Sequence, residues 1–337
     1  MRNSIDRPLA VTLLLLCGYG LAMVYSAGQT DVPTVFEGAW VRQAMWMVVA
    51  GLGGYLAYRL SFRILEWAAP FLYGFGLLLL VVVLVVGTGA GTAASSKSWL
   101  AIGGVRIGQP VELAKVGTVL LLARYLSGLR QPPASLRELI KPSLIAGVPF
   151  LLVMRQPDLG SAIVFVGILF SMLFWAGVKP SLLLLLASPA VSMLLAVDNR
   201  WWGAWILLLT MLLLVWRTYV AEGLIVWFVN SAMGVLAIVL WNRLQPHQQR
   251  RLISFLNPEA DPGNTGYQAI QSKVAIGSGG WFGNGWLDGP QKRLAFLPEQ
   301  PTDFIFSVVG EELGFVGVVT ALGLFLTLFL VMLRIAR

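Results

Sequence analysis

Cysteine, histidine and charge are all scarce in this chain of 337 residues. The single cysteine, Cys17, excludes an intramolecular disulfide and a cysteine metal cluster. The single histidine, His247, has no second histidine with which to share a metal, and a solvated loop histidine is the simpler interpretation. Charged residues make up 12% of the sequence, against 57% hydrophobic residues. This balance excludes an ordinary soluble domain.

Long apolar runs are abundant, and a run of about 20 apolar residues spans the hydrocarbon core of a bilayer as a helix. The sequence therefore predicts an all-α, polytopic helical membrane protein with about ten transmembrane helices in a single domain over residues 1–337. The expected spans cover residues 8–27, 41–60, 65–86, 110–126, a fifth ending at 154, a sixth from 158, 180–197, 201–215, 223–241 and 303–333. One long polar loop, residues 242–302, interrupts them.

The net charge of +8 raises the question of nucleic acid, but the cations lie mostly in short loops between apolar runs. Orientation signals and anionic lipid headgroups account for them better, and we expect no nucleic-acid partner. With the N-terminus in the cytoplasm, twelve cations fall on the inner side: Arg2, Arg7, Arg59, Arg63, Arg124, Arg130, Arg137, Lys141, Lys179, Arg217, Arg334 and Arg337. Five fall in short outer loops: Arg42, Lys97, Arg106, Arg155 and Arg200. This bias predicts a cytoplasmic N-terminus and an extracytoplasmic long loop.

Charged residues inside spans are costly in lipid and normally face a partner or a cavity. Glu112 and Lys115 are three positions apart, hence on one helical face, and form either an internal ion pair or the wall of a polar cavity. Arg155 and Asp158 flank a turn, and this pattern predicts that a helix ends there with a local salt bridge between the two side chains. Glu311 and Glu312 point about 100° apart on a helix, so at least one must bond to neighbouring elements.

The long loop carries the densest set of defined polar and glycine residues. Tyr267, Ile270 and Val274 recur at helical spacing and predict a short helix on the membrane surface. The glycines at 277–285, with Trp281 and Trp286, form a possible backbone-donor surface for phosphates. Asp261 lies in Asp-Pro-Gly, which from the residues alone reads most simply as a turn.

Several blocks, in order, closely resemble the SEDS family (shape, elongation, division and sporulation). They are Gln109-Pro110-Val111-Glu112-Leu113-Ala114-Lys115, Gln156-Pro157-Asp158-Leu159-Gly160, Gln271-Ser272-Lys273-Val274-Ala275-Ile276-Gly277-Ser278-Gly279-Gly280, Thr302-Asp303-Phe304-Ile305-Phe306 and Gly310-Glu311-Glu312-Leu313-Gly314. The third block is more similar to the RodA elongation branch than to the FtsW division branch. Two spans near 201–241 are additional to the family pattern, and the family's last two helices are absent after Arg337.

The resemblance implies a glycosyltransferase of the bacterial cytoplasmic membrane that polymerises lipid II into peptidoglycan strands during cell elongation. It also implies a class B penicillin-binding protein and other elongation-complex membrane proteins as partners. The alternatives are a lipid II flippase and a non-catalytic scaffold for a penicillin-binding protein. No cofactor is certain, although a divalent cation at the pyrophosphate is compatible with the chemistry.

The resemblance assigns the catalytic role to Asp261 and places Glu112 and Lys115 in a substrate cavity. Cations must stabilise charge on a departing pyrophosphate. Further residues expected to contact the substrate are Arg106, Gln271, Lys273 and Lys292, and those expected to maintain structural motifs are Gln156, Asp158, Thr302, Asp303 and Glu312.

Overall fold

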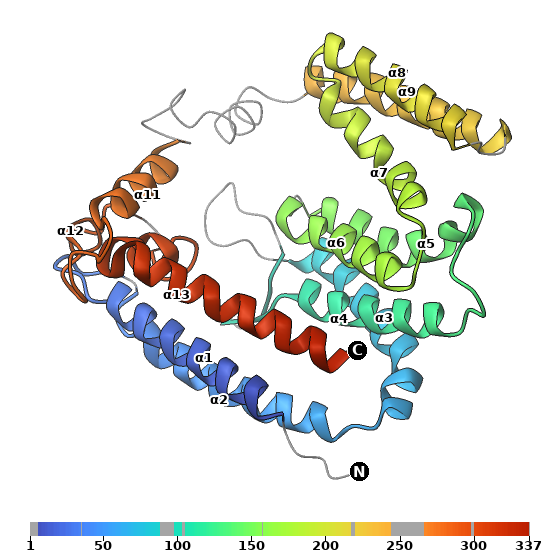
Figure 1. Cartoon of the computed structure of the whole chain (residues 1–337). Helices are drawn as coiled ribbons and strands as arrows, with labels where there is room; N and C mark the ends of the chain where they lie inside the picture. The colour runs from blue at the N-terminus through green and yellow to red at the C-terminus, as the bar shows by residue number, and fades with distance from the viewer. Residues whose placement is uncertain are drawn as a thin grey trace. The chain divides into compact units, whose positions relative to one another are not determined.

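The computed structural model describes residues 6–34, 36–87, 98–102, 105–156, 158–216, 220–243, 266–297 and 300–336, without the side chains of 101–107, 240, 242 and 243. Ten long helices in this part of the chain match the ten predicted spans within a few residues (Figure 1). They are α1 (Arg7–Ala27), α2 (Ala39–Arg59), α3 (Phe62–Val86), α4 (Pro110–Ser127), α5 (Leu136–Met154), α6 (Leu159–Trp175), α7 (Pro180–Leu195), α8 (Asn199–Val215), α9 (Val220–Arg243) and α13 (Ile305–Ala336).

The predicted fold class, a polytopic helical membrane protein, is confirmed. Four helices in the described residues are long and apolar enough to cross a membrane: α1, α3, the part of α9 from Val220 to Val239, and α13. Helices α6, α7 and α8 are apolar and somewhat shorter. Their ends follow the sequence, because Asp6, Ser61 and Asp158 each accept a hydrogen bond from a backbone N–H in the first turn of α1, α3 and α6.

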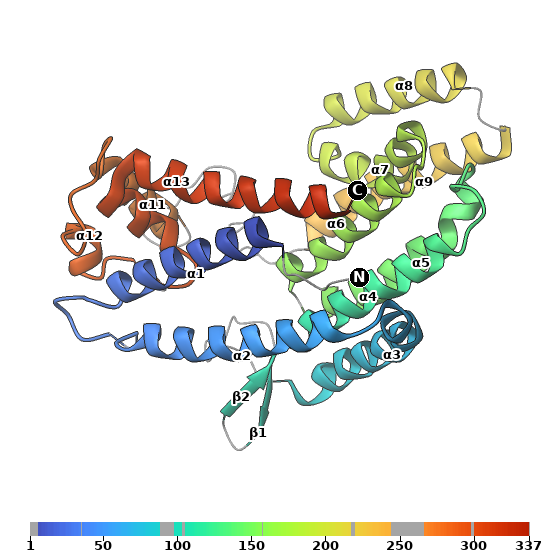
Figure 2. The same cartoon turned by 60° about the horizontal axis from the view of Figure 1, so that its bottom comes forward.

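The region from 87 to 108, expected to be a loop, contains a short antiparallel hairpin of β1 (Leu100–Ile102) and β2 (Val105–Gly108), seen in Figure 2. Ala101 pairs with Arg106 and Ile102 with Val105. The β-branched residues favour strands, but two strands this short give too weak a signal for prediction from sequence.

Contacts divide the chain into two compact units, residues 1–59 with 244–337, and residues 60–243. We call them the terminal unit and the central unit. The division into two units does not test the prediction of a single domain over residues 1–337, which stays a prediction.

The central unit contains α3 to α9. Two clusters of buried residues fill α3–α7, one around Leu80, Val111 and Phe165 and the other around Leu122 and Leu173. Helices α7, α8 and α9 pack together through an apolar cluster around Leu209, and polar side chains join α7 to α9. Asn230 donates to Ser188 Oγ at 2.8 Å, and Ser192 donates to the Asn230 carbonyl at 2.7 Å. Such satisfied polar groups hold apolar helices together where lipid provides no hydrophobic drive.

The terminal unit contains α1, α2, α11 (Tyr267–Ser278), α12 (Pro290–Arg293) and α13. Helix α1 lies along α13, and α11 and α12 gather at the start of α13 (Figures 1 and 2). Tyr19 donates to the Gly317 carbonyl at 3.0 Å, and Arg334 pairs with Asp6 at 2.6 Å. Polar contacts thus tie the two helices together at more than one level.

Helix α13 is broken at Gly314, whose φ of 63° and ψ of −160° are not helical. The carbonyls of Glu311 and Glu312 accept from the N–H groups of Asn284 (2.9 Å) and Gly285 (3.1 Å). Beyond the break, Phe315 and Val316 donate to the carbonyls at positions 280 and 281, at 2.9 and 3.1 Å. The segment 280–285 therefore replaces four hydrogen bonds that a continuous helix would make within itself.

The short helix predicted from Tyr267, Ile270 and Val274 is confirmed as α11. The face of α11 that packs on α13 is not the face that these three residues form. Ala275 is 1% exposed, and Ser272 Oγ lies 2.6 Å from Ser307 Oγ. Small residues allow the backbones of two helices to approach closely. The expected position of α11 on the membrane surface stays a prediction.

Candidate functional site

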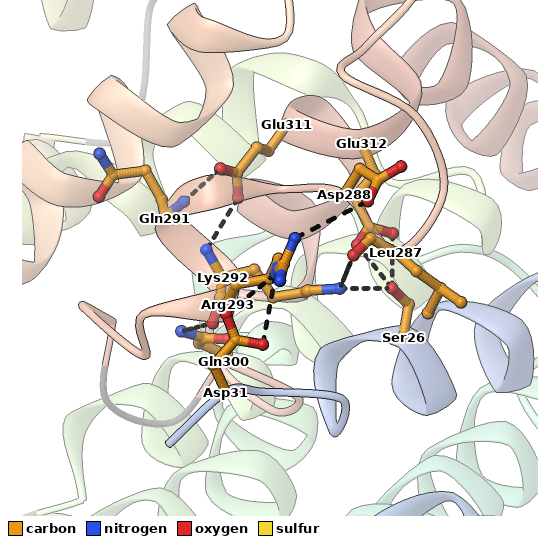
Figure 3. Close-up of polar contacts among 10 residues, drawn as sticks. All are labelled: Ser26, Asp31, Leu287, Asp288, Gln291, Lys292, Arg293, Gln300, Glu311 and Glu312. Atoms are coloured by element: carbon orange, nitrogen blue, oxygen red, sulfur yellow. Dashed lines mark hydrogen bonds and ion pairs between the residues drawn. The ribbon is translucent and has the colours of Figure 1, made fainter.

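The end of the long loop is fixed by a buried ion pair between Lys292 of α12 and Glu312 of α13 (Figure 3). Lys292 Nζ lies 2.6 Å from Glu312 Oε1, and both side chains are 0% exposed. The ammonium also donates to the Leu287 carbonyl at 3.1 Å and to Ser26 Oγ at 3.2 Å. A lysine has three N–H donors, so its hydrogen-bonding capacity is filled.

Ser26, near the end of α1, brings a third element to this pair. Its hydroxyl oxygen lies 2.6 Å from both carboxylate oxygens of Glu312, to which it donates, and Ser26 is fully buried. A buried charge is tolerated only when it is paired and hydrogen-bonded. The contacts of Ser26, Lys292 and Glu312 meet this condition, and we call these three residues the buried triad.

The neighbouring carboxylate, Glu311, contacts different partners. It accepts from the backbone N–H groups of Gln291 at 2.6 Å and Lys292 at 3.1 Å. These N–H groups open the single turn of α12 and lack partners within it, so the carboxylate caps them. The expectation that at least one of the two glutamates bonds to a neighbouring element is therefore confirmed for both, since Glu311 and Glu312 each contact α12.

An exposed contact completes the attachment of α12 to the end of α1. Arg293 Nε lies 3.1 Å from Asp31 Oδ2, with the two side chains 47% and 53% exposed, and the Asp31 N–H donates to the Arg293 carbonyl at 2.9 Å. An exposed pair of this kind adds little stability. The exposed pair is therefore a minor part of an attachment that also includes the buried triad, the Glu311 cap and the Asp31 backbone hydrogen bond.

Two sequence predictions are corrected by this geometry. Lys292, expected to contact the substrate, lies in the interior with its donors committed, so it does not present a charge to a pyrophosphate. The N–H groups of Gly283, Asn284 and Gly285 donate to backbone carbonyls and do not form a free phosphate surface. Gly283, with φ of 82°, is needed for close approach, because a Cβ there would overlap the Glu312 carbonyl.

A second polar site lies in the central unit, where α4 and α6 begin. Gln109, which precedes α4, donates to Asp158 Oδ2 at 3.2 Å, while Asp158 Oδ1 accepts from the Ser161 N–H at 3.0 Å. Gln156 is buried and donates to the Leu80 carbonyl at 3.2 Å. The predicted helix termination is confirmed, but the predicted salt bridge is wrong because Asp158 bonds to Gln109 and not to Arg155.

Glu112 and Lys115 form the predicted pair on α4, with Nζ and Oε1 2.8 Å apart. The pair is not internal, because the side chain of Glu112 is 64% exposed and that of Lys115 is 20% exposed. A carboxylate and a partly accessible ammonium are therefore held on one face, with capacity left for further hydrogen bonds. This arrangement suits a surface that binds a polar ligand.

The remaining predicted residues are distributed as follows. On α11, Gln271 is half-buried and Lys273 is exposed; Thr302 and Asp303, just before α13, are exposed. The backbone of Arg106 lies in β2, while its side chain and all of Asp261 are outside the described residues. That these residues meet in one site stays a prediction.

Sequence reasoning missed Ser26 as a partner of Glu312, from which it is 286 positions distant, and Gln109 as a partner of Asp158. Ser26 carries the weak signal of a polar residue near the end of an apolar run. In the part of the chain that the structure describes, no group of three or more His, Cys, Asp or Glu could hold a metal ion. A divalent cation remains a proposal.

Helices of this kind, with satisfied polar contacts between them, define a polytopic membrane protein. The FtsW/RodA/SpoVE model of cell cycle proteins matches residues 7–202 and 190–337. The chain therefore belongs to this family, which confirms the SEDS resemblance.

Relatives under both branch names resemble the chain. Peptidoglycan glycosyltransferase RodA of Treponema pallidum is 33% identical over 367 residues, covering 97% of this chain and 81% of that protein. Probable peptidoglycan glycosyltransferase FtsW of Trichlorobacter lovleyi is 32% identical over 336 residues, covering 98% and 76%. A solved structure described as coordination of polymerization and crosslinking by a peptidoglycan synthase complex has a TM-score of 0.62 and 29% identity, covering 97% and 76%.

Lys292→Met tests the buried triad, with Arg293→Met as its matched control. Removing one partner of a buried pair leaves an uncompensated charge and costs roughly 3–5 kcal/mol, whereas the loss of an exposed pair costs about 0–1 kcal/mol. We expect Lys292→Met to lower the unfolding temperature of the detergent-solubilised protein strongly and Arg293→Met to change it little. Adding Glu312→Gln to Lys292→Met should recover part of the loss. Equal effects of the two single variants would contradict this assignment.

Proposed function

We propose that this protein is a peptidoglycan glycosyltransferase that polymerises lipid II into glycan strands. The observation that carries the proposal is the match to RodA of Treponema pallidum, named a peptidoglycan glycosyltransferase, over 97% of this chain. The matched region includes every motif from Gln109 to Gly314. A membrane-embedded chain with a long polar loop suits a substrate whose lipid stays in the bilayer while its sugars react outside it.

In the proposed reaction, a sugar hydroxyl of one lipid-linked disaccharide attacks the anomeric carbon of another. A carbon–oxygen bond forms there as the bond to the pyrophosphate oxygen breaks, and the hydroxyl proton passes to a base. Asp261 is the proposed general base, because a carboxylate within hydrogen-bond reach can take this proton. The leaving pyrophosphate needs no strong acid, so a single essential carboxylate is sufficient.

The cations proposed to stabilise the leaving pyrophosphate are Lys115, Lys273 and Arg106. Lys115 is partly accessible and Lys273 is exposed, so either can reach a ligand at modest cost. Glu112 holds Lys115 in position through their 2.8 Å contact. Lys292 is not included, since its ammonium is fully committed within the buried triad.

The proposed partner is a class B penicillin-binding protein that crosslinks the strands. The structural similarity to a chain of a peptidoglycan synthase complex supports a role that couples polymerization to crosslinking. Elongation is proposed over division because the block from Gln271 to Gly280 resembles the RodA branch. Further elongation-complex membrane proteins are proposed as partners on the same resemblance.

Asp261→Asn tests the base directly. The amide nearly keeps the shape of the carboxylate but cannot usefully accept a proton at neutral pH. We expect purified protein, with its partner present and the transpeptidase blocked, to convert labelled lipid II into glycan strands. Asp261→Asn should lower the rate roughly 10²–10⁴-fold with no change in partner binding, and Glu112→Gln should lower it less.

The alternatives make different predictions in the same assay. A flippase or a scaffold would leave labelled lipid II unpolymerised in the parent protein as well as in the variant. If the parent polymerises and Asp261→Asn does so at a similar rate, the glycosyltransferase assignment stands and Asp261 is a turn residue.

The proposed location is the bacterial cytoplasmic membrane, with the N-terminus in the cytoplasm and the loop 242–302 outside. The excess of cations on the inner side supports it. In a background lacking Cys17, a cysteine at Asn264 should react with an impermeant thiol reagent in intact cells. Reaction only after lysis would reverse the orientation.

A further inference from the structure

A hollow lies where α4 and α6 end, at the far end of these helices from Gln109 and Asp158. Its volume is about 580 Å³, and its lining includes Leu126, Arg130, Pro133, Met172 and Trp175. All of these residues belong to the central unit. Nothing in the proposed glycosyl transfer uses this end of the helices.

A second hollow of about 480 Å³, shallower and more open than the first, continues from it along the surface between α4 and α6. The two share Ser171 and Met172, and the second is lined further by Val119, Ile163 and Gly167. Together they form a largely apolar path with Arg130 at one end. We call this path the α4–α6 groove.

The wall of the groove is packed and does not depend on a ligand. Pro133 is buried, and Pro132 lies against the turn at Gly177, whose φ is 85°. A Cβ added to Gly177 would lie 3.3 Å from Pro132 Cγ. Behind the groove, Leu122 and Leu173 are 0% exposed within a continuous apolar cluster. The groove is therefore preformed, as most small-molecule sites are.

The polar end of the α4–α6 groove has an excess of positive charge. Helix ends and links there carry Arg63, Arg124, Arg130, Arg137, Lys141 and Lys179, against the acidic Glu66 and Glu138. Arg124 donates to the Glu66 carbonyl at 3.0 Å, and Glu138 accepts from the Ala134 N–H at 2.9 Å. Arg130 is exposed, and no ion pair or hydrogen bond joins its side chain to another described residue. Its guanidinium is available to an anion.

We propose that the α4–α6 groove binds an anionic glycerophospholipid, with its headgroup phosphate on Arg130 and one acyl chain along α4 and α6. A guanidinium fits phosphate oxygens in a bidentate manner, and an apolar groove within a membrane-spanning segment suits a hydrocarbon chain. Trp175, 59% exposed beside the groove, is the kind of residue that marks the boundary between headgroups and chains. The headgroup end of this site follows the last turn of α4, whereas Glu112 and Lys115 lie in the first two turns of the same helix.

The headgroup is tested with Arg130→Gln and the control Arg137→Gln, which removes an exposed arginine that does not line the groove. The probes are phosphatidylglycerol and phosphatidylcholine, and their retention on the detergent-solubilised full chain is measured by native mass spectrometry. Arg130→Gln should reduce phosphatidylglycerol retention roughly fivefold and reduce phosphatidylcholine retention less, because the choline cation offsets the charge of its phosphate. Arg137→Gln should have a clearly smaller effect, and equal effects of the two variants would overturn the proposal.

The acyl-chain path is tested with Gly167→Leu. A Cβ at Gly167 meets nothing within 4 Å, so leucine fills the groove without a clash at its Cβ. Gly147→Leu on α5 is the matched control, because its Cβ is equally unobstructed and it does not line the groove. Only Gly167→Leu should reduce the retention of both lipids.

Two further results would overturn the proposal. Displacement of phosphatidylglycerol by millimolar inorganic phosphate would indicate a free-anion site. Stronger retention of a polyprenyl phosphate than of phosphatidylglycerol would assign the groove to a substrate-type lipid.

Discussion

The terminal unit depends on the hydrogen bonds that the backbone of segment 280–285 makes with the backbone of α13 on both sides of its break. A helix interrupted in an apolar environment leaves N–H and C=O groups unpaired, and each costs several kcal/mol in the hydrocarbon region. Segment 280–285 supplies four of the missing partners. Once this segment is held there, α12 lies close enough for Lys292 to pair with Glu312, and Ser26 brings in α1. The break and the buried triad therefore stabilise each other.

This arrangement gives the Gly-Glu-Glu-Leu-Gly motif (Gly310–Gly314) a structural meaning. Its glutamates are buried and bond to α12 and α1, while Gly314 provides the turn that admits the loop backbone. The motif thus fixes the end of the long loop. A carboxylate that acts as a base must be positioned accurately, and anchoring of the loop at its end is consistent with the proposal that Asp261 is this base.

The helices were predictable because each apolar run is long and ends at a polar, proline or glycine residue, as at Asp158. Side-chain partners were less predictable. Glu112 pairs with Lys115 three positions away, which the sequence shows, but Glu312 bonds to Ser26 at the other end of the chain, which it does not show. Lys292 was assigned wrongly because a lysine in a polar loop is normally exposed. Composition indicates a possible phosphate-binding surface at the loop glycines, because it cannot show that N–H groups in this segment face the carbonyls of a broken helix.

Hydrogen–deuterium exchange of the detergent-solubilised protein tests most directly whether the end of the loop is built into α13. The account predicts slow exchange in peptides covering 279–286 and 311–318. In Gly314→Ala, which forces a side chain into a left-handed conformation against Gly283, protection of both peptides should fall together. Gly323→Ala, whose Cβ meets nothing within 4 Å on the same helix, should leave both protected. Rapid exchange of 279–286 beside a protected 311–318 in the parent protein would contradict the account.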